Sequence, residues 1–322
     1  GVGRKRSLQV PAISQTKLPY VRTRLGTLSH PRGAAPNATV VTRPLMEGGL
    51  LLEGGHGKRP RILFLHGYGL CPELTETAGY LNGLRAALPG CIIDVPGGFH
   101  TLDLDEPVVQ NIFNDPVNGL KSVARYSKAT GTACRAWAQQ RALTAEELLP
   151  DAPPVPLAGP GAARESIDEM RASTTKLIAL VDAAEADYDV VVGFSQGGEY
   201  AIQLAARLDE LTIRKPPKRF VMIGSQVDFV FNRYEAAGTP LDYSKGRVGL
   251  TKTQFAIEAF LMAGKTDPTA ADGKFEANIQ RLRDAGIEKV CGNRFPGGHA
   301  MPPVGDEVFA AMVAGGGLCR GM

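Results

Sequence analysis

The peptide Asp189-Val-Val-Val-Gly-Phe-Ser-Gln-Gly197 joins an apolar run to a segment with helical periodicity. The valine-rich run that ends at Phe194 is typical of a strand buried on both faces of a parallel sheet. Residues 196–208 carry small and aliphatic side chains at helical spacing, which predicts a helix directly after the strand. The turn between them reads Gly193-x-Ser195-x-Gly197. Glycines at these two positions let a strand and a helix approach closely around a strained serine.

Ser195 is the first candidate catalytic residue. A sharp strand-to-helix turn lifts the serine hydroxyl above the carboxyl end of the sheet, and the helix N-terminus behind it favours a developing negative charge. We therefore predict that Ser195 is a nucleophile. The competing interpretation is a serine without a chemical role in a glycine-rich turn.

Strands and helices alternate on both sides of this turn. Five further apolar runs have the length of buried strands, at residues 61–65, 91–95, 219–223, 257–262 and 289–295. Helical periodicity occurs at 73–88, 167–184, 275–282 and 306–313, and Ser166 with Glu169 is a predicted capping box. We therefore predict an α/β fold, with a doubly wound, mostly parallel six-stranded sheet, right-handed crossovers and helices on both faces. Its functional site is expected at the carboxyl ends of the strands.

His299 is the predicted general base. A serine hydroxyl needs such a base to act as a nucleophile. In α/β-hydrolases, which share this serine turn, the chain order is serine, then acid, then histidine. Of the five histidines only His299 follows Ser195, and it comes just after the last predicted strand.

Asp267 is the predicted acid that orients this base. It ends the segment Gly264-Lys-Thr-Asp267, directly after the strand at 257–262. A carboxylate there can accept a hydrogen bond from the imidazole and fix its tautomer. Asp228 is the alternative, because it follows the preceding strand and the acid of such a triad can lie one strand earlier.

Two backbone N–H groups are predicted to form the oxyanion hole. Gln196 directly follows the nucleophile, and Tyr68 lies in the turn His66-Gly-Tyr-Gly69 after the first predicted strand. We interpret the His66 side chain as structural and His100 as a loop residue, with a pocket-lining role for His100 as the alternative. For Trp137 two interpretations stay open, a wall of an acyl pocket or the core of a lid.

Residues 100–163 interrupt the alternation of strands and helices. The segment includes a Pro/Gly-rich stretch at 150–161 and is too long for a structureless loop in a compact domain. We predict an inserted lid with short helices, and a separate linker is the alternative. The predicted organisation is therefore an N-terminal extension at 1–58 and an α/β-hydrolase domain at 59–322 that contains this lid.

Positive charge is concentrated near the N-terminus. Residues 1–46 hold eight Lys or Arg and no Asp or Glu, whereas the remainder has 28 basic and 33 acidic residues. We predict that residues 1–46 form a basic extension that contributes little to stability. The alternatives are an organelle transit peptide, or antiparallel edge strands at Thr39–Thr42 and Gly49–Leu52. The mildly acidic remainder argues against nucleic-acid binding.

The overall composition is that of a globular protein. The chain has 322 residues, 43% of them hydrophobic and 21% charged, with no run of 18 apolar residues. Its five cysteines are scattered without a CxxC pair, so the sequence predicts neither a zinc site nor a disulfide framework. A reducing compartment, the cytoplasm, fits this cysteine pattern, and an organelle is the alternative if residues 1–46 are a transit peptide.

Taken together, the motifs resemble those of the FSH-type serine hydrolases, α/β-hydrolases related to the phospholipase/carboxylesterase group. The matching segments are Leu65-His-Gly-Tyr68, Arg135-Ala-Trp137, Gly193-Phe-Ser-Gln-Gly197, Gly264-Lys-Thr-Asp267 and Gly298-His299. The resemblance covers roughly residues 60–314. It implies hydrolysis of carboxylic esters or thioesters without a cofactor, by a triad of Ser195, Asp267 and His299.

The sequence thus predicts a serine hydrolase that forms an acyl-enzyme on Ser195 and acts on a small-molecule ester or thioester. One alternative is a non-catalytic binding module on the same scaffold. Another is a lipase or a depalmitoylase-type acyl-protein thioesterase, which needs a wide apolar groove under its lid. No cofactor, metal, nucleic-acid partner or stable membrane insertion is expected, and the sequence carries no signal for an oligomeric state.

Overall fold

The computed structural model describes backbone and side chains at residues 59–114, 120–138, 166–243, 257–271 and 273–315. It describes the backbone alone at 40–42, 141–142 and 163–164. All of these residues belong to one unit of the chain, Asn37–Met322. Apart from residues 40–42, the predicted extension at 1–58 lies outside the described residues, as does the Pro/Gly-rich stretch 150–161.

Within the described residues the main sheet has seven strands, and six of them run parallel, as predicted. In spatial order they are β1 (Val40–Thr42), β3 (Ile92–Val95), β2 (Arg61–Leu65), β8 (Val190–Phe194), β9 (Arg219–Ile223), β10 (Glu258–Gly264) and β11 (Lys289–Phe295). β8, which leads into the serine turn, is the central strand. The nucleophile candidate therefore lies at the middle of the sheet's carboxyl edge.

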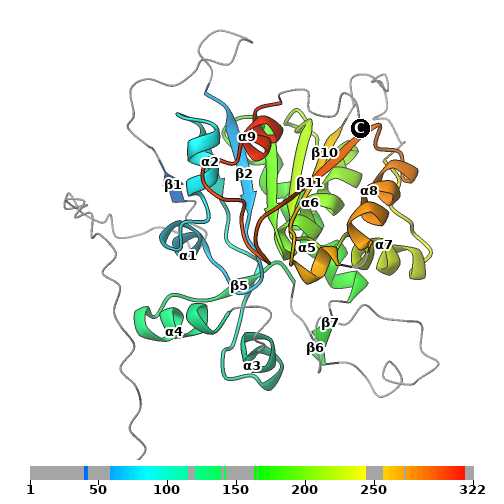
Figure 1. The fold of residues 1–322 in the computed structure, drawn as a ribbon. Coiled ribbons are helices and arrows are strands. Elements are labelled where there is room, and N and C mark those ends of the chain that lie inside the picture. The colour runs from blue at the N-terminus through cyan, green and yellow to red at the C-terminus, as the bar shows by residue number, and fades with distance from the viewer. Residues whose placement is uncertain are drawn as a thin grey trace, which may run out of the picture. The chain divides into compact units, whose positions relative to one another are not determined.

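Alternate residues of the parallel strands face opposite sides of the sheet and build one hydrophobic core on each side. Along β2, Leu63 and Leu65 belong to one core, while Ile62 and Phe64 belong to the other. Figure 1 shows helices on both faces of the sheet. One core includes residues of α5 (Ile167–Asp182), α6 (Gln196–Ala206), α7 (Val227–Ala236) and α8 (Lys274–Asp284), and the other includes residues of α2 (Asn82–Ala87) and α9 (Glu307–Ala314).

Helix starts agree with the capping pattern, but one predicted helix is wrong. Ser166 Oγ accepts a hydrogen bond from the Glu169 N–H at 3.1 Å, which confirms the predicted cap of α5. The single helix predicted at 73–88 is two helices, α1 (Pro72–Thr77) and α2. The turn between them contains Gly79, whose φ of 78° ends the first helix and lets the chain change direction.

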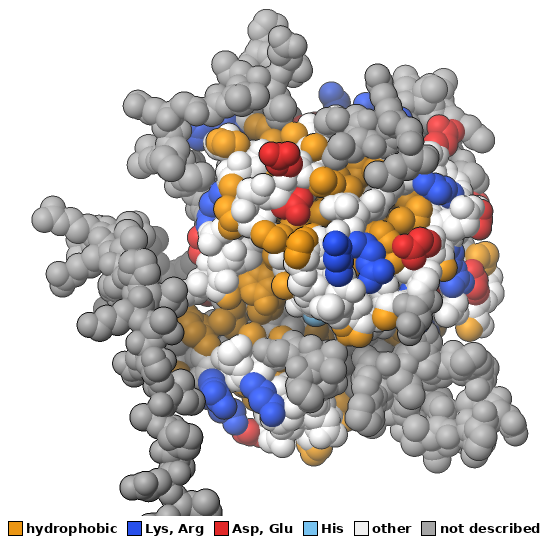
Figure 2. Space-filling view, in the orientation of Figure 1, with side chains coloured by type: hydrophobic (Ala, Val, Ile, Leu, Met, Phe, Trp, Pro, Cys, Tyr) orange, Lys and Arg blue, Asp and Glu red, His pale blue; other side chains and the backbone are white. Residues whose placement is uncertain are grey.

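The first part of the predicted lid packs onto the body of the domain. It contains α3 (Pro107–Asn114), α4 (Lys121–Thr130) and a ladder between β4 (His100–Thr101) and β5 (Arg135–Ala136), so the expected short helices are present. Phe113 and Val123 join the core that also holds Tyr68. A second ladder joins β6 (Arg141–Ala142) to β7 (Ala163–Arg164). Figure 2 shows apolar side chains in a hollow between the body and the part that contains α3 and α4.

Two further findings concern the cysteines and the membrane. Cys71, Cys91 and Cys134 are buried and free, but Cys291 in β11 is disulfide-bonded. The cysteine spacing did not predict this bond. In the part of the chain that the structure describes, no helix combines the length and apolar character needed to cross a membrane.

β1 corrects the expectation that residues 1–46 lie wholly outside the fold. Val40–Thr42 pairs antiparallel with β3, with Val41 opposite Asp94. This register agrees with the alternative of an edge strand at Thr39–Thr42. The second alternative strand, at Gly49–Leu52, lies outside the described residues. β1 covers the edge of β3, which would otherwise present unpaired backbone groups to solvent.

We therefore expect deletion of residues 1–46 to lower the melting temperature, because it removes β1 and exposes the edge of β3. A loss of about 1–2 kcal/mol corresponds to a fall of ~2–8 °C in a domain of this size. The matched control is deletion of residues 1–36, which keeps β1. Equal melting temperatures for the two truncated proteins, measured by calorimetry, would contradict a stabilising role for this strand.

Candidate active site

Ser195 has the strained backbone that its motif predicts. Its φ of 52° and ψ of −122° make it the only non-glycine residue with positive φ among the residues described. The turn is fixed by close contacts, because a Cβ at Gly193 would overlap the backbone of Gly197, and one at Gly197 would overlap the Leu65 carbonyl. The Ser195 N–H donates to the Ile223 carbonyl of β9 at 2.8 Å. Strand, helix and neighbouring strand together hold the serine in this conformation.

His299 lies within hydrogen-bond distance of this serine. The loop after β11 places its Nε2 2.9 Å from Ser195 Oγ. The imidazole also packs against the ring of Phe194, with 5.2 Å between ring centroids. The loop itself is tied to the loop after β10, since the Thr266 N–H donates to the Gly297 carbonyl at 2.9 Å. These contacts fix the ring where it can accept the serine proton.

Asp267 completes a hydrogen-bonded chain with His299. Its Oδ2 lies 3.1 Å from His299 Nδ1, and its Oδ1 accepts hydrogen bonds from the N–H and hydroxyl of Thr269. Burial raises the pKa of the Asp267 carboxyl, but hydrogen bonds from His299 and Thr269 outweigh it, so the pKa lies below its ordinary value. The carboxylate is therefore ionised and can hold the Nδ1–H tautomer of His299.

Gly224 is a site residue that the sequence analysis missed. It follows β9, has a φ of 58°, and its N–H donates to the Met262 carbonyl of β10. A Cβ at this position would lie 3.0 Å from both Asp267 Oδ2 and His299 Nδ1. Positive φ and this tight contact both favour glycine. No motif marks it in the sequence, because its neighbours in space come from two other strands.

The structure also brings the two predicted oxyanion-hole residues to the serine. Gln196 is the first residue of α6 and is buried. The loop that carries Tyr68 passes beside the nucleophile, since a Cβ at Gly67 would lie 3.3 Å from Ser195 Cβ. The Gly67 carbonyl accepts hydrogen bonds from the Leu70 N–H at 3.2 Å and from His66 Nδ1 at 2.8 Å. That the backbone N–H groups of Tyr68 and Gln196 bind the oxyanion stays a prediction.

His66 and Trp137 are both buried beside this loop. His66 is wholly buried, and its Nε2 accepts a hydrogen bond from the Gly98 N–H at 3.0 Å. Its structural interpretation fits this position. Trp137 is also wholly buried, in the core that contains Leu63 and Tyr200. Neither interpretation of Trp137 was right, because it lines no exposed wall and belongs to the core of the domain body.

The structure does not bring the remaining candidates to this cluster. Asp228 lies in the first turn of α7, while Asp267 occupies the position beside His299. His100 lies in β4 with its Nε2 3.6 Å from Glu169 Oε1. Among the described residues, no three His, Cys, Asp or Glu side chains are grouped so that they could hold a metal ion.

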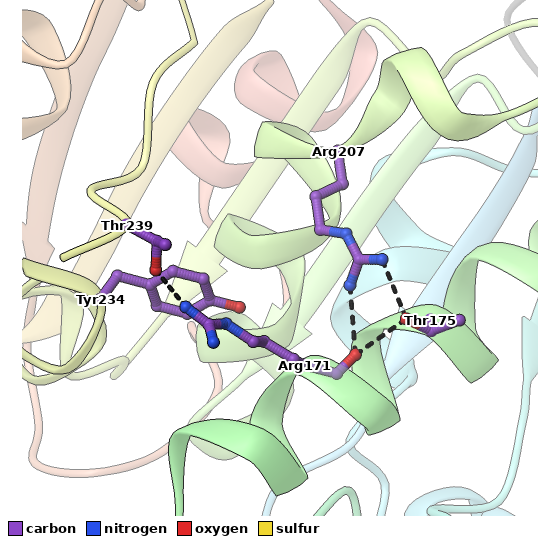
Figure 3. Close-up of a pocket in the computed structure, with 5 residues that line it drawn as sticks. All are labelled: Arg171, Thr175, Arg207, Tyr234 and Thr239. Carbon is purple, nitrogen blue, oxygen red and sulfur yellow. Dashed lines mark hydrogen bonds between the residues drawn. The ribbon is translucent and has the colours of Figure 1, made fainter. Parts of the chain in front are cut away.

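A cavity of about 230 Å³ lies elsewhere, between α5, the end of α6 and α7. It is lined by Arg171, Thr175, Arg207, Tyr234 and Thr239. Figure 3 shows that these polar groups bond to one another: Arg207 donates to the Arg171 carbonyl and to Thr175, and Arg171 donates to Thr239. Arg207 also pairs with Glu210 at 2.5 Å. This mutual pairing is that of a structural network, and no nucleophile and base are present.

Known proteins resemble this chain in sequence or in fold. The sequence model of the serine hydrolase (FSH1) family matches residues 56–308. A solved acyl-protein thioesterase 2 from Zea mays has 21% identity and a TM-score of 0.48, covering 84% of this chain and 95% of its own. A Bacillus cereus carboxylesterase has 14% identity and a TM-score of 0.48, with coverage of 86% and 92%. No curated protein matches by sequence.

We expect Gly224→Ala to reduce turnover far more than it reduces stability. The added methyl group presses on the Asp267–His299 pair, and a displacement of about 1 Å in a catalytic group can cost ~10²-fold in rate. The matched control is Gly238→Ala, which has a φ of 68° but open space at Cβ. Both variants should lose about 1–2 kcal/mol of stability, and only Gly224→Ala should lose activity in an assay of ester hydrolysis. Wild-type activity in Gly224→Ala would contradict this role.

We also expect His66 to stay neutral in mildly acidic solution. Complete burial lowers its pKa to about 4 from 6.5. Between pH 6.5 and pH 4 the imidazole of His66 binds a proton in the unfolded chain but not in the folded chain. Acidification through this range therefore lowers the free energy of unfolding, by about 3 kcal/mol in total. A two-dimensional NMR titration of the histidine Cε1–H signals tests this. Each of the other four histidines is replaced by Gln in a separate variant, and the signal present in all four variants belongs to His66. Titration of this signal near pH 6.5 would contradict the prediction.

Proposed function

Because the chain belongs to the serine hydrolase (FSH1) family, we propose that it cleaves carboxylic esters or thioesters through an acyl-enzyme formed on Ser195. The observation that carries this proposal is the continuous hydrogen-bonded chain from Ser195 Oγ through His299 to Asp267. The strained turn at Ser195 supports it, since such strain persists only where the surroundings enforce it. A binding module would need neither feature.

Acylation begins when Ser195 Oγ attacks the acyl carbon of the substrate. His299 Nε2 takes the serine proton as the new C–O bond forms, and the carbonyl electrons move onto the oxygen. The intermediate then collapses, the bond to the leaving alcohol or thiol breaks, and His299 returns its proton to that group. Asp267 stabilises the imidazolium that exists between these two proton transfers.

Deacylation repeats the same steps with water in place of the serine. His299 Nε2 removes a proton from the water as it attacks the acyl carbon, and returns it to Ser195 Oγ when the acid leaves. In both halves of the reaction the oxyanion is bound by the N–H groups of Tyr68 and Gln196. The N-terminus of α6 adds its positive dipole end at the same point.

The acyl part of the substrate is proposed to be apolar. The ring of Phe194 packs against the base, His299, and also against Tyr80, with 5.2 Å between the centroids in each pair. The hollow beside α3 and α4 in Figure 2 is also lined with apolar side chains. Rates across a series of acyl-chain lengths, measured for matched oxyesters and thioesters, distinguish a short-chain esterase from a lipase or depalmitoylase.

We expect a fluorophosphonate probe to label the wild-type protein covalently and to fail on Ser195→Ala. His299→Ala should lose ester turnover by several orders of magnitude while its melting temperature stays close to wild type, because removal of one triad member disables the whole unit. Mass spectrometry of the labelled peptide locates the modified residue. Labelling at another residue, or more than about a tenth of the activity in His299→Ala, would contradict the proposal.

Two matched variants test which aspartate orients His299. Asp267→Asn keeps the shape of the side chain but donates to Nδ1 and so favours the wrong imidazole tautomer, an exchange that can cost ~10⁴-fold. Asp228→Asn makes the same chemical change on the first turn of α7 and should leave turnover unchanged. If the two variants exchanged phenotypes, Asp228 would be the acid.

A further inference from the structure

Residues Arg135–Ala138 contact both segments that carry the proposed oxyanion donors, the loop after β2 and the start of α6. The segment includes β5 and comes from the insertion that follows β3, far from Ser195 in sequence. It makes three hydrogen bonds to the loop His66–Leu70 and two to the side chain of Gln196. We call Arg135–Ala138 the bridging segment.

The loop that carries Tyr68 is bound on both sides of that residue. Before it, Trp137 Nε1 donates to the His66 carbonyl at 2.7 Å. After it, the Gly69 N–H donates to the Arg135 carbonyl at 2.9 Å, and the Arg135 N–H donates to the Leu70 carbonyl at 3.1 Å. The bridging segment therefore fixes the peptide groups on each side of the Tyr68 N–H.

The residue after the nucleophile is bound to the same segment. The Trp137 N–H donates to Gln196 Oε1 at 3.0 Å, and Gln196 Nε2 donates to the Ala138 carbonyl at 3.4 Å. Trp137 thus contacts one proposed donor residue through its backbone and the loop of the other through its indole. These two contacts tie the loop that carries Tyr68 to the residue that follows the nucleophile.

The position of Trp137 is itself fixed by packing. Its ring is wholly buried and lies against His66, Phe99 and Tyr200, with centroid separations of 5.1, 5.5 and 6.2 Å. The low dielectric of such a site strengthens a hydrogen bond and makes a lost one costly. The indole N–H is therefore a rigid reference point for the His66 carbonyl.

Because peptide groups are planar, the hydrogen bond to the His66 carbonyl also restricts the orientation of the peptide groups that follow it. Holding the His66 carbonyl sets the plane of the His66–Gly67 peptide, and the next plane holds the Gly67 carbonyl and the Tyr68 N–H on opposite sides. Leu70 and the His66 side chain bind that Gly67 carbonyl, so the Tyr68 N–H points the other way. Without the indole N–H, the His66 carbonyl loses this hydrogen bond, and the His66–Gly67 peptide plane can tilt.

We propose that Trp137 is a positioning residue that holds the oxyanion hole in its active geometry. The proposal rests on the function proposed above and adds a residue that touches neither the substrate nor the triad. It predicts that the indole N–H contributes to transition-state stabilisation and contributes little to substrate binding.

The sharpest test removes only that N–H. Trp137 is the single tryptophan of the chain, so growth of a tryptophan auxotroph on 3-benzothienylalanine exchanges this N–H for sulfur at one site. We expect kcat for an ester to fall about ten-fold or more with KM within about two-fold of wild type. Complete loss of one oxyanion donor costs ~10²–10³-fold, which bounds the effect.

A second readout separates positioning from a general structural role. A trifluoromethyl ketone forms a tetrahedral oxyanion on the serine, whereas the corresponding secondary alcohol cannot. The inhibition constant of the ketone should rise in parallel with the loss of kcat, and that of the alcohol should stay constant. A structural defect that lowers the active fraction would leave both constants unchanged.

Two further variants serve as a packing control and as a replacement test. Phe99→Leu removes one of the three ring contacts of the indole and no hydrogen bond. His66 and Tyr200 still flank the ring, so this variant should lower the melting temperature and keep kcat and the ketone affinity. Gln196→Met removes both side-chain hydrogen bonds to the bridging segment and keeps the backbone N–H. If the benzothienyl protein does not fold, Gln196→Met tests the positioning role in its place. We expect this variant to show the same loss of kcat and of ketone affinity.

The outcomes are distinct. Unchanged kcat and ketone affinity in the benzothienyl protein, or in Gln196→Met if the former does not fold, would overturn the positioning role. A similar loss in Phe99→Leu would overturn it too, because packing alone would then explain the effect. If the wild-type protein neither hydrolyses esters or thioesters nor binds the ketone, the proposed function itself fails.

Discussion

The strained backbone of Ser195 is the constraint on which the rest of the site depends. A non-glycine residue at φ 52° costs of order 1–3 kcal/mol and must be held by its surroundings. Here the restraint is steric, because Gly193 and Gly197 let β8, α6 and the end of β2 approach without any Cβ between them. The same close approach brings the loop after β2 beside the serine. One packing arrangement therefore both exposes the nucleophile and places the loop expected to bind the oxyanion.

Much of this arrangement could be predicted because it is local. The six parallel strands, the serine turn and the cap at Ser166 all depend on residues close together in sequence. The Ser195–Asp267–His299 grouping also follows from simple geometry. Parallel strands end at one edge of the sheet, so residues just after β8, β10 and β11 meet there.

The features that could not be predicted depend on contacts between distant segments. Gly224 is required by side chains that arrive from two other strands, and Trp137 by loops on either side of the nucleophile. The start of α7, Val-Asp-Phe-Val-Phe, is rich in β-branched and aromatic residues, so local propensity favours a strand as readily as a helix. β1 is a short strand whose pairing with β3 depends on a partner more than 50 residues away.

The two histidines of the site show how burial assigns roles to identical side chains. His66 is wholly buried, and its pKa is lowered to about 4, so it serves as a neutral group with one donor and one acceptor. The His299 side chain keeps 18% of its surface exposed, while that of Asp267 behind it has none. A base must exchange its proton with substrate and water, whereas the group that orients it must not. The proposed triad is therefore buried on its Asp267 side, and we expect the substrate to approach from the exposed side of His299.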